Sequence, residues 1–438
     1  MSVYSAFSDF AKRTYLPGFN NQLQTDPGTM MSLYGLDPDA AVGLEGNEWK
    51  LKIQIGDSLG GGAMTQGGSF PTPGDFQSDE ASLTLALLAH TIEFDGHEVG
   101  LLDSDMGAAT AVIAKKMAAA KDAMARDIER QTWMDGTGKL ANIASSSGST
   151  ITLDATTTSQ IDRDRYLWVD DAYRHTYDVV NGTTGAQQVT AFTVSDIAES
   201  TEVLTCSATM TSATSAGVVV RSGTWASGGA FTSYEFPGIA ALVDDDNTYL
   251  GINRSTAGNQ HWKAVVSANS GTLRTLTETL IHSQLAKMAR RASSGKQPNG
   301  SNYKAFGNIG VWNAYQQIMS PGMRYTASER PDIGWGDPLP LMGIPFYKDI
   351  HAPRNNVWFL KDGGFKYVTA KHNQTGLMRF KENAGGSIFF QVPQASGAGY
   401  LDRMQAFLVG FLGMYTDRPR DFGRLDDITE VAPIYGTA

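Results

Sequence analysis

The sequence predicts an α+β fold in which one long helix lies among many strands. Residues 49–55 and 81–87 contain alternating apolar and polar residues, as half-buried strands do. An alanine-rich stretch, residues 104–134, has apolar residues at helical spacing. Residues 145–233 are rich in Ser, Thr, Gly and Val and contain short apolar runs typical of strands. Together these patterns predict a mixed α+β architecture.

Composition places the chain among folded proteins and excludes several function classes. At about 150 residues per domain, 438 residues suggest roughly two to four domains. The 35 Lys and Arg against 45 Asp and Glu give a net charge of −10, which argues against a dedicated DNA-binding protein. The single cysteine, Cys206, excludes intrachain disulfides and cysteine-based metal sites. The longest apolar run, 406–415, is too short for a membrane span of about 20 residues.

The first 45 residues are expected to form an extended N-terminal arm. They mix aromatic residues with Asn, Gln and Gly and show no sustained period of 3.6 or 2 residues. Phe7, Phe10 and Tyr15 lie in this arm, and a soluble monomer would have to hide them. The pattern fits an arm packed on a neighbouring subunit and equally an arm folded onto its own domain.

Residues 46–92 are expected to form a β-hairpin with a long, flexible tip. The first strand pattern, 49–55, runs into Gly56–Gly74, where six glycines follow Gly56 together with Pro71 and Pro73. The second strand pattern, 81–87, then brings the chain back. The tip is therefore much longer than an ordinary hairpin turn.

Residues 93–150 contain the clearest helix pattern, over 104–134. Asp103 or Ser104 can cap its start, and Gly136 and Gly138 can end it. One apolar stripe has spacings of four, three, four and four residues: Ile113, Met117, Ala120, Met124 and Ile128. At about 1.5 Å per residue this helix would be roughly 45 Å long, enough to brace a fold.

The rest of the chain divides into three expected parts: a β-rich insertion at 151–235, an α+β domain at 236–362, and closing strands at 363–438. Strand patterns of the insertion are 151–153, 189–194 and 218–220. The α+β domain has helix patterns near 273–291 and 311–319 and strand patterns near 343–347 and 357–360. The closing segment has strand patterns at 387–392 and 404–415.

One motif is similar to a hydrolase site. Gly56-Asp57-Ser58-Leu59-Gly60 fits the G-x-S-x-G pattern, in which Ser58 would be the nucleophile. A serine nucleophile needs a histidine base and an orienting acid, yet no histidine here has an aspartate three residues before it. The motif also leads into further glycines, whereas a nucleophile elbow leads into a helix. A strand that ends in a flexible tip explains these residues better.

The other motifs also fall short of a catalytic, cofactor or metal site. His97-Glu98 begins like a zinc-binding helix, but Leu101 stands where the second histidine is needed. Asp244–Asp246 lacks the spacing of a calcium loop. Neither Gly138-Lys139 nor Gly295-Lys296 completes a phosphate-binding loop. We therefore expect a protein that is not an enzyme and that uses no cofactor and no metal.

The order of these parts resembles the major capsid proteins of tailed bacteriophages, which have the Hong Kong ninety-seven type fold. In that family the hairpin is the extended loop, the long helix is the spine of a peripheral domain, and the α+β region is an axial domain. Short strings similar to those of the family occur in the expected order: 236–242, 249–256 with Trp262, 343–347, and 402–407 with 418–420. Residues 151–235 depart from the minimal fold and are expected to be an inserted subdomain.

The resemblance implies a shell protein. Its subunits would form pentamers and hexamers that tile an icosahedral or prolate capsid around double-stranded DNA, assembled in the host cytoplasm without sequence-specific DNA binding. The hairpin would lie across the adjacent subunit, with Trp49, Ile53, Ile55 and Leu83 as apolar anchors. A portal protein, scaffolding and decoration proteins are further implied partners, and no membrane is. Because the arm is short, the scaffolding protein would be a separate chain.

Two alternatives to a capsid protein remain at this point. A bacterial encapsulin-like compartment would use the same shell architecture for a different content. An ester hydrolase of the Gly-Asp-Ser-Leu type would use Ser58.

Overall fold

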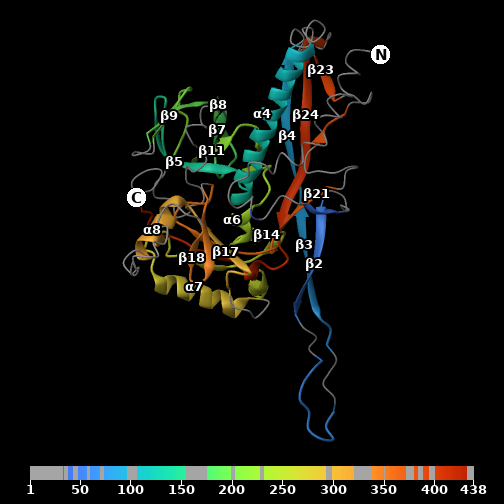
Figure 1. Cartoon of the computed structure of the whole chain (residues 1–438), viewed down its shortest axis with the longest axis vertical. Coiled ribbons are helices and arrows are strands. Elements are labelled where there is room, and N and C mark those ends of the chain that lie inside the picture. Colours follow the sequence, from blue (N-terminus) through green and yellow to red (C-terminus); the bar gives the residue numbers. More distant parts are fainter. Residues whose placement is uncertain are drawn as a thin grey trace, which may run out of the picture.

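The strands of the computed structural model gather into three large sheets. The structure describes Leu33 and residues 38–42, 48–56, 60–69, 74–95, 106–153, 175–198, 203–226, 231–292, 298–319, 338–349, 351–370, 379–382, 388–393 and 400–431. These residues form two six-stranded sheets, one seven-stranded sheet and three two-stranded pairs. Figure 1 shows a long helix beside the first sheet and a strand pair that reaches far beyond the body. The mixed α+β class expected from the sequence is confirmed.

The first sheet is built around strand β24 (Tyr400–Tyr415), and we call it the spine sheet. Its other strands are β1 (Pro38–Val42), β4 (Ala86–Asp95), β21 (Lys366–Ala370), β22 (Arg379–Phe380) and β23 (Phe389–Pro393). β4 lies antiparallel along one side of β24, from Asp95 opposite Arg403 to Ala86 opposite Leu412. β21, β22 and β23 pair with the other side, and β1 joins β21 in parallel. One long strand therefore organises the whole sheet.

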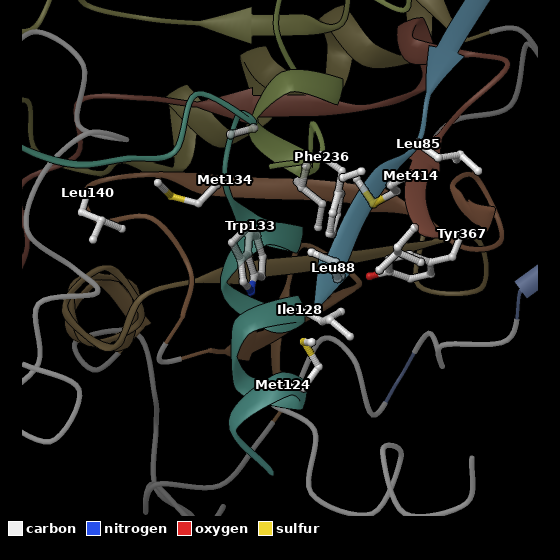
Figure 2. Close-up of a cluster of buried hydrophobic side chains, with 14 of the residues drawn as sticks. Leu85, Leu88, Met124, Ile128, Trp133, Met134, Leu140, Phe236, Tyr367 and Met414 are labelled. Carbon is white, nitrogen blue, oxygen red and sulfur yellow. The ribbon is translucent and has the colours of Figure 1, made fainter. Parts of the chain in front are cut away.

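Helix α4 (Met106–Trp133) packs against β4 and confirms the helix predicted over 104–134. Met117, Met124 and Ile128 are buried in one core with Leu88 and Ile92 of β4. Figure 2 shows Met124 and Ile128 on the last turns of α4, with Leu88 beside them. The apolar stripe of the sequence is thus the face that this part of the helix turns towards the spine sheet.

Two glycines end α4, as predicted. Gly136 and Gly138 have φ values of +82° and +69°, a left-handed conformation that other residues rarely adopt. A Cβ on Gly136 would also lie 2.8 Å from the Cα of Pro237, so two chain segments cross closely here. Trp133, in the last turn, is fully buried with its ring 6.1 Å from that of Phe306. This end of the helix thereby joins the spine sheet to the next sheet.

The second six-stranded sheet is called the axial sheet. Its strands, in spatial order, are β16 (Val265–Ser267), β25 (Gly423–Leu425), β20 (Val357–Lys361), β17 (Tyr303–Gly307), β19 (Ile344–Lys348) and β18 (Leu339–Leu341). Helices α7 (Glu278–Arg291) and α8 (Ile309–Met319) pack on it, near the predicted positions. Trp358 and Leu360 enter the core shared with α4, whereas Val357 and Phe359 enter the core shared with α7 and α8. β20 is apolar throughout because alternate residues enter two cores.

Short elements beside the axial sheet are held together by Arg254. They are α6 (Ile239–Leu242), β14 (Thr248–Tyr249), β15 (Ile252–Asn253) and the 3-10 turns η3 (Asn259–Trp262) and η5 (Pro419–Asp421). The buried Arg254 side chain donates hydrogen bonds to the carbonyls of Ala241, Leu242 and Trp262, at 2.6, 2.7 and 3.0 Å. Its guanidinium also lies 4.7 Å from the ring centre of Tyr249. Three carbonyl oxygens thus satisfy a cation that would be costly to bury alone.

The seven-stranded sheet is called the insertion sheet. Its strands, in spatial order, are β8 (Gln187–Phe192), β7 (Tyr177–Asn181), β11 (Gly217–Arg221), β5 (Lys139–Ser147), β6 (Thr150–Leu153), β10 (Val203–Cys206) and β9 (Val194–Ala198). The outer strands β8 and β9 are separated only by Thr193, so the sheet curls until its edges meet. The carbonyl of Thr193 accepts a 2.8 Å hydrogen bond from the Ser207 amide, which extends the pairing of β9 with β10 to the residue that joins β8 and β9. A strand pair, β12 (Trp225–Ala226) and β13 (Thr232–Ser233), follows.

Three details differ from the sequence-based expectations. The predicted strand 81–87 is divided at Leu85, where β3 (Gln77–Thr84) ends and β4 begins, because the chain changes its partner from the hairpin to β24. The insertion sheet begins at Lys139, whereas we expected the insertion from residue 151. Within the closing segment, β25 belongs to the axial sheet, not to the spine sheet. Each difference concerns the sheet that a strand joins, which depends on residues distant in the sequence.

Candidate functional site

The candidate site is the antiparallel pair of β2 (Glu48–Gly56) and β3, which we call the hairpin. Its strands pair from Glu48 opposite Thr84 to Gln54 opposite Ser78. In the described part of the chain, no third strand joins them. Figure 1 shows the hairpin extending well beyond the body of the molecule. A two-stranded pair is at best marginally stable alone in water, so the outer part of the hairpin needs another surface.

The root of the hairpin is packed against the spine sheet. The ring of Trp49 lies 4.4 Å from that of Tyr415 on β24. Leu83 is buried and packs over Gly413, where an added Cβ would lie 3.0 Å from the Leu83 side chain. A glycine at this position lets β24 approach the hairpin closely. The direction in which the hairpin leaves the body is therefore set by core contacts.

The tip of the hairpin exposes apolar side chains. Residues 61–69 are all exposed, and Met64 keeps 45% of its surface in solvent. Phe76, immediately before β3, is 58% exposed. Gly67 has a φ of +82°, which lets the chain turn between Thr65 and Gly68. Large apolar side chains on such an extension are the kind of surface that another protein covers.

The predicted hairpin anchors differ in how much surface they have left. Trp49 and Ile55 are half-buried and can still contact another molecule. Ile53 and Leu83 are buried, with 9% and 2% of their surface exposed, and support the hairpin from within. The arm residues Phe7, Phe10 and Tyr15 lie outside the residues that the structure describes, as does Ser58.

A groove of about 770 Å³ lies beside the root of the hairpin. Its lining includes Leu85 and Leu87 from the spine side, Met124 from α4, and Tyr234 and Pro237 from the segment that follows the insertion. Leu87 is 55% exposed and Tyr234 is 57% exposed. The groove therefore offers apolar surface on the body of the molecule, whereas the tip offers apolar surface on the projecting hairpin.

Two acidic residues in the lining of this groove, Asp127 and Glu235, form ion pairs with arginines, and one of these pairs holds the insertion sheet on α4. Arg130 of α4 binds Glu235 with both guanidinium Nη atoms, one at 3.0 Å, and donates to Asp127 at 2.9 and 3.1 Å. Arg221 of β11 donates to the same Asp127 carboxylate. Burial acts to raise the pKa of Asp127, but Arg130 and Arg221 hold it below its usual value. Asp127 thus anchors the buried Arg130 and the half-buried Arg221, whereas Glu235 pairs with Arg130 although burial raises the pKa of its carboxyl.

Leu87 and Tyr234 were not predicted as site residues. Apolar side chains occupy both faces of the strand from Leu83 to Ala89, so alternation alone does not show which one points outward. The position of Tyr234 depends on Glu235, which is drawn to Arg130 more than 100 residues earlier in the chain. The exposure of Leu87 and Tyr234 at the groove consequently depends on tertiary contacts, and the periodicity of the sequence does not predict it.

Two other kinds of site, a metal centre and a membrane-spanning helix, concern the same described residues. Three or more His, Cys, Asp or Glu residues that could hold a metal ion do not come together there. The described helices include none that is both long enough and apolar enough to cross a membrane.

The similarities found to known proteins are distant and are all to solved structures. Neither a protein-family model nor a curated protein matches the sequence. Among solved structures, the chain is similar to the capsid of cyanophage A-1(L), with 13% identity, a TM-score of 0.49, and coverage of 92% of this chain and 93% of that one. It is also similar to the capsid of a native GTA particle, with 11% identity, a TM-score of 0.41, and coverage of 90% and 87%.

A third structure of this kind is the encapsulin of Synechococcus elongatus, with 8% identity, a TM-score of 0.41, and coverage of 93% and 89%. These structures are capsid and encapsulin proteins. At 8–13% identity they carry no information about the role of any individual residue.

Proposed function

We propose that this chain is the subunit of a self-assembling protein shell, the major capsid protein of a tailed bacteriophage. The observation that carries the proposal is the hairpin, a two-stranded extension with an apolar tip and no third strand in the described residues. Such an extension is costly for a monomer and is stabilised when another subunit covers it.

The contact that we propose joins two different surfaces of the same molecule. The tip of one copy, with Met64 and Phe76, would enter the groove of the next copy beside Leu87 and Tyr234. Contacts between unlike surfaces produce rings when the rotation closes, which fits pentamers and hexamers. The glycines of the tip would let it adapt to the different angles within these rings.

The remaining parts are assigned in line with this proposal. Residues 1–45 would be an arm on a neighbouring subunit, with Phe7, Phe10 and Tyr15 as contacts. Residues 46–92 would be the extended loop, in which Trp49, Ile53, Ile55 and Leu83 act as anchors. Residues 93–150 and 363–438 would form the peripheral domain, 236–362 the axial domain, and 151–235 an inserted subdomain.

The shell would enclose double-stranded DNA in a virion assembled in the host cytoplasm. A portal protein and separate scaffolding and decoration proteins would be partners of the shell. A net charge of −10 supports a container that does not grip its DNA strongly.

Negative-stain electron microscopy of the purified full-length chain tests this proposal. We expect closed shells, tubes or five- and six-membered rings. Deletion of residues 60–69 should abolish them while the circular dichroism spectrum and melting temperature stay the same. Normal shells from the deleted chain would contradict the proposed role of the hairpin.

The content of purified virions or shells separates the alternatives. Double-stranded DNA inside the shell supports a capsid, whereas a packaged protein would indicate an encapsulin-like compartment. The hydrolase alternative lacks its structural context in the described residues, because β2 ends at Gly56 and residues 60–69 form no helix. An esterase activity of the purified chain that disappears in Ser58→Ala would support the hydrolase alternative.

A further inference from the structure

A second, polar cleft lies between β2 and the turns η3 and η5. Its volume is about 490 Å³. The hairpin contributes Lys52, Gln54 and Ile55 to its lining. The body contributes His261 from η3, together with Arg418 and Arg420 at η5. The cleft is thus shared by the projecting hairpin and the axial part of the molecule.

Positive charge in this cleft is not balanced by the chain itself. Three cationic side chains line it, Lys52, Arg418 and Arg420, against one carboxylate, Asp417. Arg418 and Asp417 are 3.6 Å apart and their side chains are more than half exposed, so this pair is weak. Lys52 and Arg420 form no hydrogen bond or ion pair in the part of the chain that the structure describes. This imbalance is notable in a chain with a net charge of −10.

Cationic side chains near the cleft, unlike Lys52 and Arg420, do have partners within the described part of the chain. The excess of positive charge is therefore confined to the cleft. Lys361, close to η5, is paired with Asp421 at 2.6 Å. Arg291 of α7 donates to the carbonyl of Gln260 at 3.0 Å. Burial lowers the pKa of Arg291, Asp245 acts to raise it, and the positive charge of Arg420 lowers it further. Arg420 therefore adds positive potential to a region that already holds a partly buried guanidinium.

We propose that this cleft binds phosphate groups, with Lys52 on the hairpin and Arg418 and Arg420 on the body as the ligating side chains. Guanidinium groups bind phosphate oxygens through paired hydrogen bonds, and an ammonium adds a mobile point charge. Three cations against one carboxylate leave an excess of two positive charges, which matches a phosphate dianion or two neighbouring phosphodiesters. The volume leaves room for more than one phosphate group.

Occupation of the cleft has a mechanical consequence. A phosphate that contacts both Lys52 and Arg420 would bridge the hairpin to the body and hold the hairpin in one orientation. Two-stranded pairs otherwise exchange their amide hydrogens readily because their hydrogen bonds are exposed. The cleft and its occupant stand independently of shell formation, so the two proposals fail separately.

The test is a titration of the full-length chain with inorganic pyrophosphate at constant ionic strength, followed by calorimetry. We expect saturable binding that weakens at least about tenfold in Lys52→Gln and in Arg420→Gln, since each removes a charged hydrogen-bond donor. Arg403→Gln is the matched control, because it removes the same charge from β24, where Arg403 pairs with Glu93 away from the cleft. Its affinity should equal that of the unchanged protein.

Amide hydrogen exchange of the hairpin supplies a second readout. It distinguishes a phosphate that bridges the hairpin to the body from a general effect of ionic strength. Pyrophosphate should slow amide exchange in residues 48–56, and this protection should vanish in Lys52→Gln. Absence of saturable binding, equal affinity in all three variants, or equal protection by sodium chloride of the same ionic strength would each overturn the proposal.

Two further ligands identify the source of the phosphate. Competition of a single-stranded oligothymidylate with pyrophosphate assigns the site to a nucleic acid backbone, and binding of pyrophosphate alone assigns it to free phosphate. Tighter binding of hexaglutamate than of pyrophosphate would show that the cleft recognises protein carboxylates, and the phosphate proposal would then be wrong.

Discussion

At the scale of single residues, buried charges decide how the parts of this molecule are joined. Arg130 and Arg221 come from α4 and β11, and both bind the carboxylate of Asp127. Glu235 adds a second acceptor for Arg130. A buried charge that loses its partner is strongly destabilising, so none of these residues can be changed independently.

Arg130→Met should therefore lower the free energy of unfolding by about 3–5 kcal/mol, because Glu235 would remain buried without its partner. Denaturant unfolding measures this loss. Arg126→Met is the control, since Arg126 is exposed on the same helix and should cost less than about 0.5 kcal/mol. Equal effects of the two substitutions would show that the buried pair contributes little.

A histidine beside this cluster makes stability depend on pH. Burial lowers the pKa of His90 below its usual 6.5, and the charge of Arg221 lowers it further, while Asp127 opposes this. The folded state therefore holds His90 neutral when the unfolded chain already takes up a proton. The contribution is fully present above about pH 6.5 and is lost as the pH falls below it.

His90→Gln should accordingly reduce the loss of unfolding free energy between pH 7.5 and pH 5.5. Denaturant unfolding at both pH values gives this difference. His282→Gln changes an exposed histidine on α7 and should leave the loss unchanged. A decline as steep in His90→Gln as in the unchanged chain would refute the assignment to His90.

At the scale of elements, the end of α4 depends on backbone conformation and on close packing together. Gly136 and Gly223 have φ values of +82° and +84°, so an alanine is strained by about 1–2 kcal/mol at either position. A Cβ at Gly136 would also collide with Pro237, whereas a Cβ at Gly223 would meet nothing within 4 Å. The two glycines therefore separate conformational strain from contact.

Gly136→Ala should consequently destabilise the protein more than Gly223→Ala does. The difference between their melting temperatures measures the contact with Pro237 alone. If both substitutions lower the melting temperature equally, the segment after the insertion is able to move aside at no cost.

The tip of the hairpin is an element whose side chains serve another molecule. Met64→Ser combined with Phe76→Ser should prevent assembly and leave the melting temperature of the subunit nearly unchanged, because both side chains are exposed. Size-exclusion chromatography with light scattering reports the assembly state. Met64→Leu with Phe76→Leu keeps the apolar surface and should still assemble. Assembly of the serine variant would show that other contacts suffice.

At the scale of the whole molecule, strand β20 of the axial sheet links the two main hydrophobic cores. Trp358 and Phe359 are neighbours on β20 and enter different cores. Neither core can lose its packing without exposing part of the other. Calorimetry of the serine tip variant should therefore show these two sheets unfolding in one transition. Separate transitions for Trp358→Ala and Phe359→Ala would contradict this coupling.

The helix, several strands and the hairpin were predictable because each has a periodic pattern of apolar residues that are close together in the sequence. Met117, Met124 and Ile128 repeat at helical spacing, and Trp49–Ile55 alternates. The division at Leu85 and the start of the insertion sheet at Lys139 were not predictable, since both depend on which distant strand supplies a partner. Of the candidate site, the two paired strands followed from the sequence, whereas the groove did not.

The amino-acid sequence by itself determined the apolar stripe of α4, the glycines that follow its end, and the two strand patterns of the hairpin. These features depend on residues that are close together in the sequence, because residue type sets the local backbone conformation and residue spacing sets which side chains share a face. Only the tertiary structure decided that Leu83 is buried and Leu87 exposed, that Arg130 meets Glu235, and that Lys52 shares a cleft with Arg420. Those outcomes depend on contacts between residues far apart in the chain, whose burial and charge are set when the sheets pack together.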